Sequence, residues 1–166
     1  MVSAITGLFW LLGDMGLSSA TIQRAEITHK QVSTLFWINI GVSLLISSVI
    51  AALAPAIASF YHEPRLTRVT LALAGTLVFA GLTNQHYALL TRQMRFGAMA
   101  LVQTLPQLVS AAVGIGLAVA GWGYWALVIM GIAGGATMAL TAWIASGWRP
   151  GLPSRSSGVG SMLAFG

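Results

Sequence analysis

The stretch at residues 101–144 reads LVQTLPQLVSAAVGIGLAVAGWGYWALVIMGIAGGATMALTAWI and contains no Asp, Glu, Lys or Arg. It joins two apolar runs, 96–120 and 124–146, across the gap 121–123. Because the hydrocarbon core of a bilayer is about 30 Å thick, roughly 20 apolar residues cross it as a helix. Each run is therefore long enough to span a membrane, and the short gap makes the two helices antiparallel neighbours.

The sequence upstream has the same pattern. Residues 34–59 and 66–90 are also apolar and carry no charge at their centres. A charge at mid-helix costs about 2.5–3.5 kcal/mol on insertion scales, so lipid would confine charges to the gaps. With 57% hydrophobic and 7% charged residues, the composition excludes a soluble domain. We predict an all-α, multi-pass transmembrane bundle with helices at 34–59, 66–90, 96–120 and 124–146.

Both ends of the sequence predict a longer protein. Residues 1–12 are apolar but too short to cross a bilayer, so we interpret 1–17 as the last part of a spanning helix. No basic region precedes this run, which makes it a poor signal peptide. Residues 147–166 are polar and contain proline, and they predict a cytoplasmic segment that leads to another helix. The chain is thus expected to be a membrane-embedded fragment.

The distribution of basic residues predicts the orientation. Six of the eight lie in the first, third and last gaps: Arg24, Lys30, Arg92, Arg95, Arg149 and Arg155. Cytoplasmic gaps are enriched in Lys and Arg, so these three gaps are placed in the cytoplasm. Aromatic residues at the proposed cytoplasmic ends agree with this: Phe36, Trp37, Trp143 and Trp148. Basic residues paired at helix ends serve topology, and no nucleic-acid partner is predicted.

Polar residues in the predicted helices recur on single faces. Gln103, Gln107, Ser110 and Gly114 form one stripe, Asn39, Ser43 and Ser47 another, and Thr76, Thr83 and Tyr87 a third, beside Asn84, Gln85 and His86. A lipid-facing amide would leave polar atoms unpaired, so these faces are expected to point inward. Their side chains either form interhelical hydrogen bonds or line a hydrated cavity. The candidate cavity residues are Asn39, Asn84, His86, Gln103 and Gln107.

Each charged residue that is a candidate for the functional site has two interpretations. Asp14 either caps a helix or handles a coupling ion. Arg24, Arg92 and Arg95 anchor the topology or attract an anionic group. The three acids, Asp14, Glu26 and Glu63, lie far apart in the sequence, so no paired-carboxylate site is visible and no enzyme is predicted. No acid or second histidine stands at ligand spacing from His86, and the chain has no cysteine, so neither a metal nor a cofactor is predicted.

Four runs, taken in order, carry a resemblance to a known family: GDMGLSSATIQRAEITHKQVSTLFWINIG, LAPAIASFYHEPRL, TRQMRFGAMALVQ and GWGYWALV. They resemble the amino-terminal half of bacterial polysaccharide biosynthesis exporters, the Wzx-type flippases of the multidrug, oligosaccharidyl-lipid and polysaccharide exporter superfamily. The resemblance implies about a dozen helices in two pseudo-symmetric bundles around a central cavity. This chain would supply the end of the second helix through the sixth.

The resemblance also implies a function. Such exporters move undecaprenyl-diphosphate-linked oligosaccharide across the bacterial inner membrane for surface polysaccharides such as the O-antigen of lipopolysaccharide. The implied partners are membrane lipid, the lipid-linked oligosaccharide and the remainder of the exporter. Three alternatives stay open: a drug or cation antiporter of the same superfamily, a membrane glycosyltransferase or polymer ligase, and an inactive truncated fragment.

Overall fold

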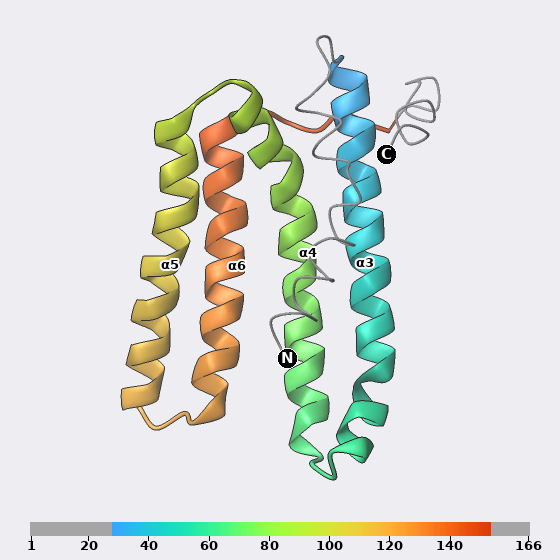
Figure 1. Cartoon of the computed structure of the whole chain (residues 1–166), viewed down its shortest axis with the longest axis vertical. Coiled ribbons are helices and arrows are strands. Elements are labelled where there is room, and N and C mark those ends of the chain that lie inside the picture. Colours follow the sequence, from blue (N-terminus) through green and yellow to red (C-terminus); the bar gives the residue numbers. More distant parts are fainter. Residues whose placement is uncertain (1–27, 154–166) are drawn as a thin grey trace.

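The computed structural model describes residues 28–153. This part of the chain forms four helices: α3 (His29–Phe60), α4 (Arg65–Arg92), α5 (Phe96–Val119) and α6 (Tyr124–Ser146). Figure 1 shows them side by side in the order α5, α6, α4, α3, with the pairs α3–α4 and α5–α6 antiparallel and the central pair α4–α6 parallel. Each is long and apolar enough to cross a membrane. The prediction of an all-α, multi-pass membrane bundle is thereby confirmed. The predicted partial helix at 1–17 and residues 154–166 lie outside the described part.

The first described helix begins before its apolar run. α3 starts at His29 rather than at residue 34, because Thr28 and Gln31 form a capping box. The Thr28 hydroxyl accepts from the Gln31 backbone N–H at 3.4 Å, and the Gln31 side chain accepts from the Thr28 backbone N–H at 2.9 Å. Two donors at the helix start are satisfied in this way without any apolar residue. The polar turn therefore extends the helix beyond the hydrophobic segment.

The α3–α4 pair is held by close packing of small residues. A Cβ atom added at Gly81 would lie 2.8 Å from the Ser43 Cβ, so the two helices touch there without room for another carbon. Further along, the Ser47 hydroxyl donates to the Ala74 carbonyl at 2.7 Å. The serine stripe on α3 therefore acts as interhelical contact, one of the two roles expected for it.

α6 contacts both of its neighbours through glycines. Gly134 faces the Ser110 hydroxyl of α5, where an added Cβ would lie at 3.2 Å, and Ser110 donates to the Met130 carbonyl at 2.9 Å. Gly135 faces α4, where an added Cβ would lie 3.0 Å from the Phe79 Cδ2 atom. Small residues on α6 thus let a helix approach on each side.

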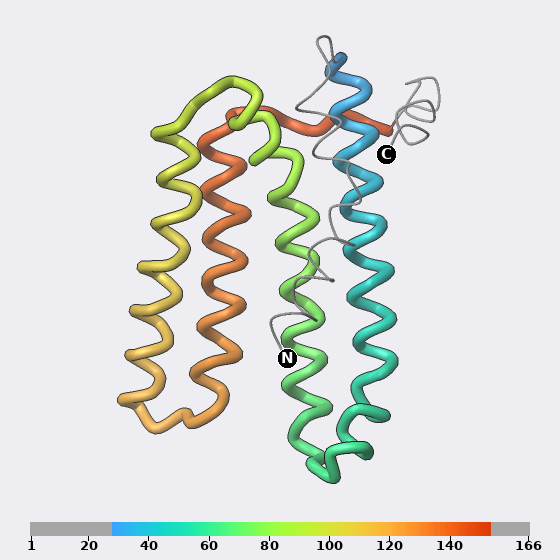
Figure 2. Tube along the Cα trace, in the orientation of Figure 1, coloured from blue at the N-terminus to red at the C-terminus, as the bar shows by residue number. Residues whose placement is uncertain are grey.

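A segment that follows α6 crosses back to α3 and joins these two helices. Residues 147–153, which we call the strap, run across α4 and reach α3, as Figure 2 shows. There the Trp37 indole N–H donates to the Gly151 carbonyl at 2.9 Å, and the Gly151 backbone N–H donates to the Ser33 hydroxyl at 2.9 Å. Gly147 allows the departure from α6, because it ends that helix in the left-handed conformation with φ at 64°.

Candidate functional site

An open polar surface lies where α5 approaches α4. Gln103 and Gln107 are both exposed and stand one turn apart, so they share a side of α5. The Gln103 amide N–H donates to the Tyr87 hydroxyl of α4. Asn84, which is half-buried, precedes Tyr87 by three residues and therefore lies on the same side of α4. We call these four residues, Asn84, Tyr87, Gln103 and Gln107, the polar face.

The four residues of the predicted stripe on α5 lie in two different environments. α5 packs against α6 through buried Val102 and Pro106 and through the Ser110 contact, and Gly114 is buried against Met130. The two glutamines point to one side of this seam and are exposed in the described part of the chain. Ser110 and Gly114 thus face a neighbouring helix, as expected for the whole stripe. Gln103 and Gln107 lie outside the α5–α6 contact, and Gln103 contacts Tyr87 of α4 instead.

Asn39 and His86 lie away from the polar face, inside the packed structure. Asn39 is 1% exposed in the α3–α4 contact, and its amide nitrogen and oxygen have no hydrogen-bond partner among the described residues. His86 is fully buried, and its Nδ1 atom forms a hydrogen bond with the Ser146 hydroxyl at 2.8 Å. The structure therefore separates these two candidates from the three that lie on the polar face.

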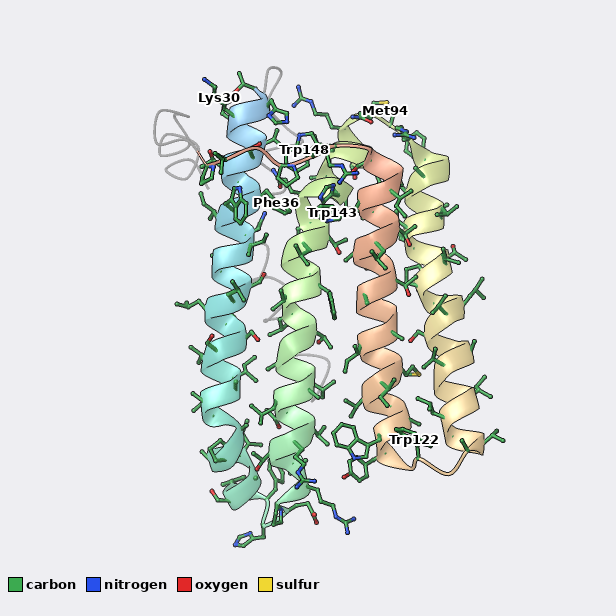
Figure 3. All side chains as sticks on the ribbon, turned by 180° about the vertical axis from the view of Figure 1, so that it is seen from behind. Lys30, Phe36, Met94, Trp122, Trp143 and Trp148 are labelled. Carbon is green, nitrogen blue, oxygen red and sulfur yellow. The ribbon has the colours of Figure 1, made fainter. Side chains whose placement is uncertain are left out.

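His86 is the centre of an aromatic cluster at the end of the bundle where α4 and α6 finish. Its ring centroid lies 4.7 Å from Trp143, 5.2 Å from Trp148 and 5.8 Å from Phe36. Figure 3 shows Phe36, Trp143 and Trp148 gathered at the end opposite Trp122. Residues 28–153 hold no group of three His, Cys, Asp or Glu side chains that is able to bind a metal. We infer that His86 has a packing role here.

The basic candidates stand at the same end as the aromatic cluster. Arg92, half-buried, ends α4, and Arg95 follows it in the loop before α5. The Arg95 guanidinium donates to the Ala145 carbonyl at 2.8 Å, where a cation meets the negative end of the α6 dipole. Arg95 therefore helps to fix the loop on α6. Among the described arginines of α4, Arg92 is the one closest along the helix to the polar face. Arg24 and Asp14 lie outside the described residues.

Two grooves between α4 and α6 are too apolar to receive sugar. The first has a volume of about 420 Å³, and its walls include Leu66, Val69, Leu73, Tyr124, Leu127 and Val128. At its mouth the Arg65 guanidinium lies 3.7 Å from the Glu63 carboxylate. The second, of about 580 Å³, is lined by Phe79, Leu82, Leu140 and Trp143 among others, together with Arg149. The polar face is therefore the better candidate site for a hydroxyl-rich ligand.

Sequence analysis missed the residues that hold the strap on α3. His29 donates from Nε2 to the Arg149 carbonyl at 3.1 Å, next to the contacts made by Ser33 and Trp37. These partners lie more than a hundred positions apart in the sequence, so helical periodicity carries no signal of them. The only hint was the set of tryptophans expected at the cytoplasmic ends.

Three known proteins that are similar to this chain are all named as biosynthesis proteins. The chain is 27% identical over 163 residues to the lipopolysaccharide biosynthesis protein WzxC of Escherichia coli, covering 93% of this chain and 32% of the relative. It is 31% identical over 97 residues to the teichuronic acid biosynthesis protein TuaB of Bacillus subtilis, covering 58% and 20%. With the succinoglycan biosynthesis transport protein ExoT of Rhizobium meliloti it shares 26% identity over 121 residues, covering 71% and 24%.

The chain thus spans a third or less of the length of these relatives. No solved structure matches it. The sequence profile of one family, described as polysaccharide biosynthesis protein, matches residues 1–166. With four helices in residues 28–153 that are able to span a membrane, and a profile that matches its whole length, this chain is a multi-pass membrane protein and belongs to the polysaccharide biosynthesis protein family.

Proposed function

We propose that the full-length protein moves a lipid-linked oligosaccharide, carried on undecaprenyl diphosphate, across the bacterial inner membrane, and that the polar face lines its path. The observation that carries this proposal is the exposure of Gln103 and Gln107 on a helix able to span the membrane. Gln103 donates to the Tyr87 hydroxyl, but lipid offers no partner to any polar amide atom that such a contact leaves over, at a penalty of several kcal/mol. A hydrated path beside α5 removes that penalty and gives the two glutamines a role.

The chemistry of the polar face suits a sugar. Amide and phenol groups offer both donors and acceptors, which is what hydroxyl groups require. The diphosphate needs cations, and Arg92 stands at the cytoplasmic end of the same helix that carries Asn84 and Tyr87. We assign Arg92 and Arg24 to attraction of the diphosphate, and Asp14 to ion coupling. The lipid tail stays in the bilayer throughout.

The family supports transport rather than catalysis. The three relatives are named for the biosynthesis of lipopolysaccharide, teichuronic acid and succinoglycan, and the last is named as a transport protein. All of these are polysaccharides or contain one. The widely separated acids argue against hydrolysis or glycosyl transfer, so we propose that the protein is not an enzyme. Its partner in movement is the remainder of the exporter, and alternating exposure of the path to the two sides would complete transport.

A double replacement tests the polar face. In the full-length protein, Gln103→Leu with Gln107→Leu should abolish surface polysaccharide while membrane insertion stays intact, because leucine offers no group to sugar or water. Gln103→Asn with Gln107→Asn keeps both amides and serves as the matched control, which should retain export. Membrane level is measured with a fluorescent tag and export by staining of surface polysaccharide. Normal export by the leucine variant would refute the proposed role.

A further inference from the structure

The strap is fastened at three successive points along the first three turns of α3. His29 donates to the Arg149 carbonyl at 3.1 Å, Ser33 accepts from the Gly151 N–H at 2.9 Å, and Trp37 donates to the Gly151 carbonyl at 2.9 Å. The three α3 residues are spaced four apart, so they form one row along the helix. Gly151 has both its backbone groups satisfied, which leaves that peptide fixed in place.

The strap also carries Trp148, whose ring packs against rings of α3 and α4. Trp148 lies 5.7 Å from His29 and 5.8 Å from Phe36, both on α3, and 5.2 Å from His86 on α4. Its neighbour Trp143 on α6 donates to the Leu82 carbonyl of α4 at 3.1 Å. Aromatic rings from α3, α4, α6 and the strap thus share one cluster. Moving the strap would expose the buried His86 and leave several rings unpacked.

We infer that the strap is a permanent clip, closed in every state of the transport cycle, which makes the cytoplasmic ends of α3, α4 and α6 one rigid body. The row of hydrogen bonds fixes its position, and the aromatic cluster resists its release. Relative movement between these helices and the remainder of the exporter then leaves residues 147–153 in place. This inference goes beyond the proposed function, and it rests on that function only for the export measurement below.

A disulfide across the clip tests the inference. A Cβ atom added at Gly151 would lie 3.3 Å from the His29 Cε1 atom and 3.4 Å from the Ser33 hydroxyl oxygen, and Gly151 does not adopt the left-handed conformation, so cysteine fits there once the imidazole shifts slightly. The Ser33 hydroxyl oxygen marks the approximate place of a cysteine sulfur at position 33, so the two new side chains are close enough to be joined by a disulfide. The pair Ser33→Cys and Gly151→Cys is introduced into the full-length protein with any native cysteines replaced. Residues 1–166 contribute none.

Two properties of the double-cysteine variant are measured in a host with an oxidising cytoplasm. Disulfide formation is followed by protection of the thiols from a maleimide polymer, and export by surface polysaccharide. We expect the disulfide to form in most molecules, with no loss of export relative to either single variant. The matched control is Ser33→Cys with Trp122→Cys, since Trp122 stands at the opposite end of the bundle (Figure 3) and should form no intramolecular disulfide.

Two results would overturn the inference. Absence of the disulfide in correctly inserted protein would show that the strap is not docked on α3. A disulfide that stops export until a reductant is added would show that the strap must open. If Ser33→Cys itself prevents insertion, His29→Cys with Gly151→Cys joined by a short bismaleimide is scored in the same two ways. Absence of export by the unmodified protein would instead count against the proposed function.

Discussion

Among the described glycines, Gly81 has the tightest surroundings and provides the sharpest stability prediction. At Gly81 of α4, an added Cβ would lie 2.8 Å from the Ser43 Cβ, closer still to the Ser43 hydroxyl oxygen, and 3.1 Å from the Asn39 carbonyl. Replacement of Gly81 by alanine must therefore move α3 and α4 apart. Two carbon atoms pack best at about 3.5–4.0 Å, so the required shift is roughly 1 Å.

The magnitude follows from that shift. A gap of about 0.5–1 Å forfeits a quarter to a half of the attraction between facing atoms. Overpacked contacts of this kind typically reduce the free energy of unfolding by about 1–3 kcal/mol. Alanine also has a better helix propensity than glycine, worth up to about 1 kcal/mol in the opposite direction. We expect Gly81→Ala to destabilise the protein by about 1–2 kcal/mol after this offset.

Gly75 provides the matched control on the same helix. A Cβ added at Gly75 meets no atom within 4 Å, so Gly75→Ala should be neutral or slightly stabilising. Both variants of the full-length protein are unfolded by increasing mole fractions of sodium dodecyl sulfate in mixed micelles, with loss of helix followed by circular dichroism. The difference between their midpoints isolates the steric effect from the helix propensity.

A compensating change makes the test specific. Ser43→Gly removes the Cβ and the hydroxyl that the new methyl group meets, and only the contact with the Asn39 carbonyl remains. The double variant Ser43→Gly with Gly81→Ala should therefore recover part of the loss, with an interaction energy of about 0.5–3 kcal/mol in a double-mutant cycle. Equal midpoints for Gly81→Ala and Gly75→Ala would refute the contact.

Two further substitutions test other contacts. Gly135→Ala should destabilise the protein, because its Cβ would meet Phe79 at 3.0 Å, whereas Gly131→Ala should not, because nothing lies within 4 Å of a Cβ there; the same detergent titration measures both, and equal losses would contradict the packing. Trp37→Phe removes the N–H that binds the Gly151 carbonyl and should reduce the free energy of unfolding by about 1 kcal/mol. Protease added to inside-out vesicles should also cleave the strap of this variant faster than that of the unmodified protein. An unchanged cleavage rate would count against the contact.

The sequence predicts the helical, membrane-embedded fold because a bilayer imposes long uncharged segments. The predicted runs 96–120 and 124–146 nearly coincide with α5 and α6, whose ends are marked by glycine and aromatic residues. At the start of α3 the apolar pattern fails as a guide, because hydrogen bonds between Thr28 and Gln31 begin the helix in a polar turn. Hydropathy measures transfer into lipid and carries no information on such caps.

The candidate site is predictable only in part. Helical periodicity establishes that Gln103, Gln107, Ser110 and Gly114 share a side of α5, but not what covers that side. In the structure α6 covers Ser110 and Gly114, and the two glutamines stay exposed. Which residues are covered depends on how neighbouring helices cross, which is a tertiary property absent from a single helix pattern.

The same limit explains Asn39 and the strap. The polarity of Asn39 predicts that it avoids lipid, and it does so by burial between α3 and α4, away from the polar face. The strap contacts join residues near position 30 to residues near position 150, through backbone groups whose use no side-chain pattern reveals. Long-range hydrogen bonds to backbone carbonyls of this kind become visible only in a three-dimensional structure.

The most direct test asks whether water or lipid surrounds the exposed glutamines. Gln103→Cys and Gln107→Cys are compared with Leu108→Cys, since all three positions are exposed on α5 and the leucine should face hydrocarbon. A maleimide reacts with the thiolate, which forms only in contact with water. In the full-length protein in native membranes, we predict rapid labelling at 103 and 107 and little at 108. Equal labelling at all three positions, or labelling at 108 alone, would contradict a hydrated path along the polar face.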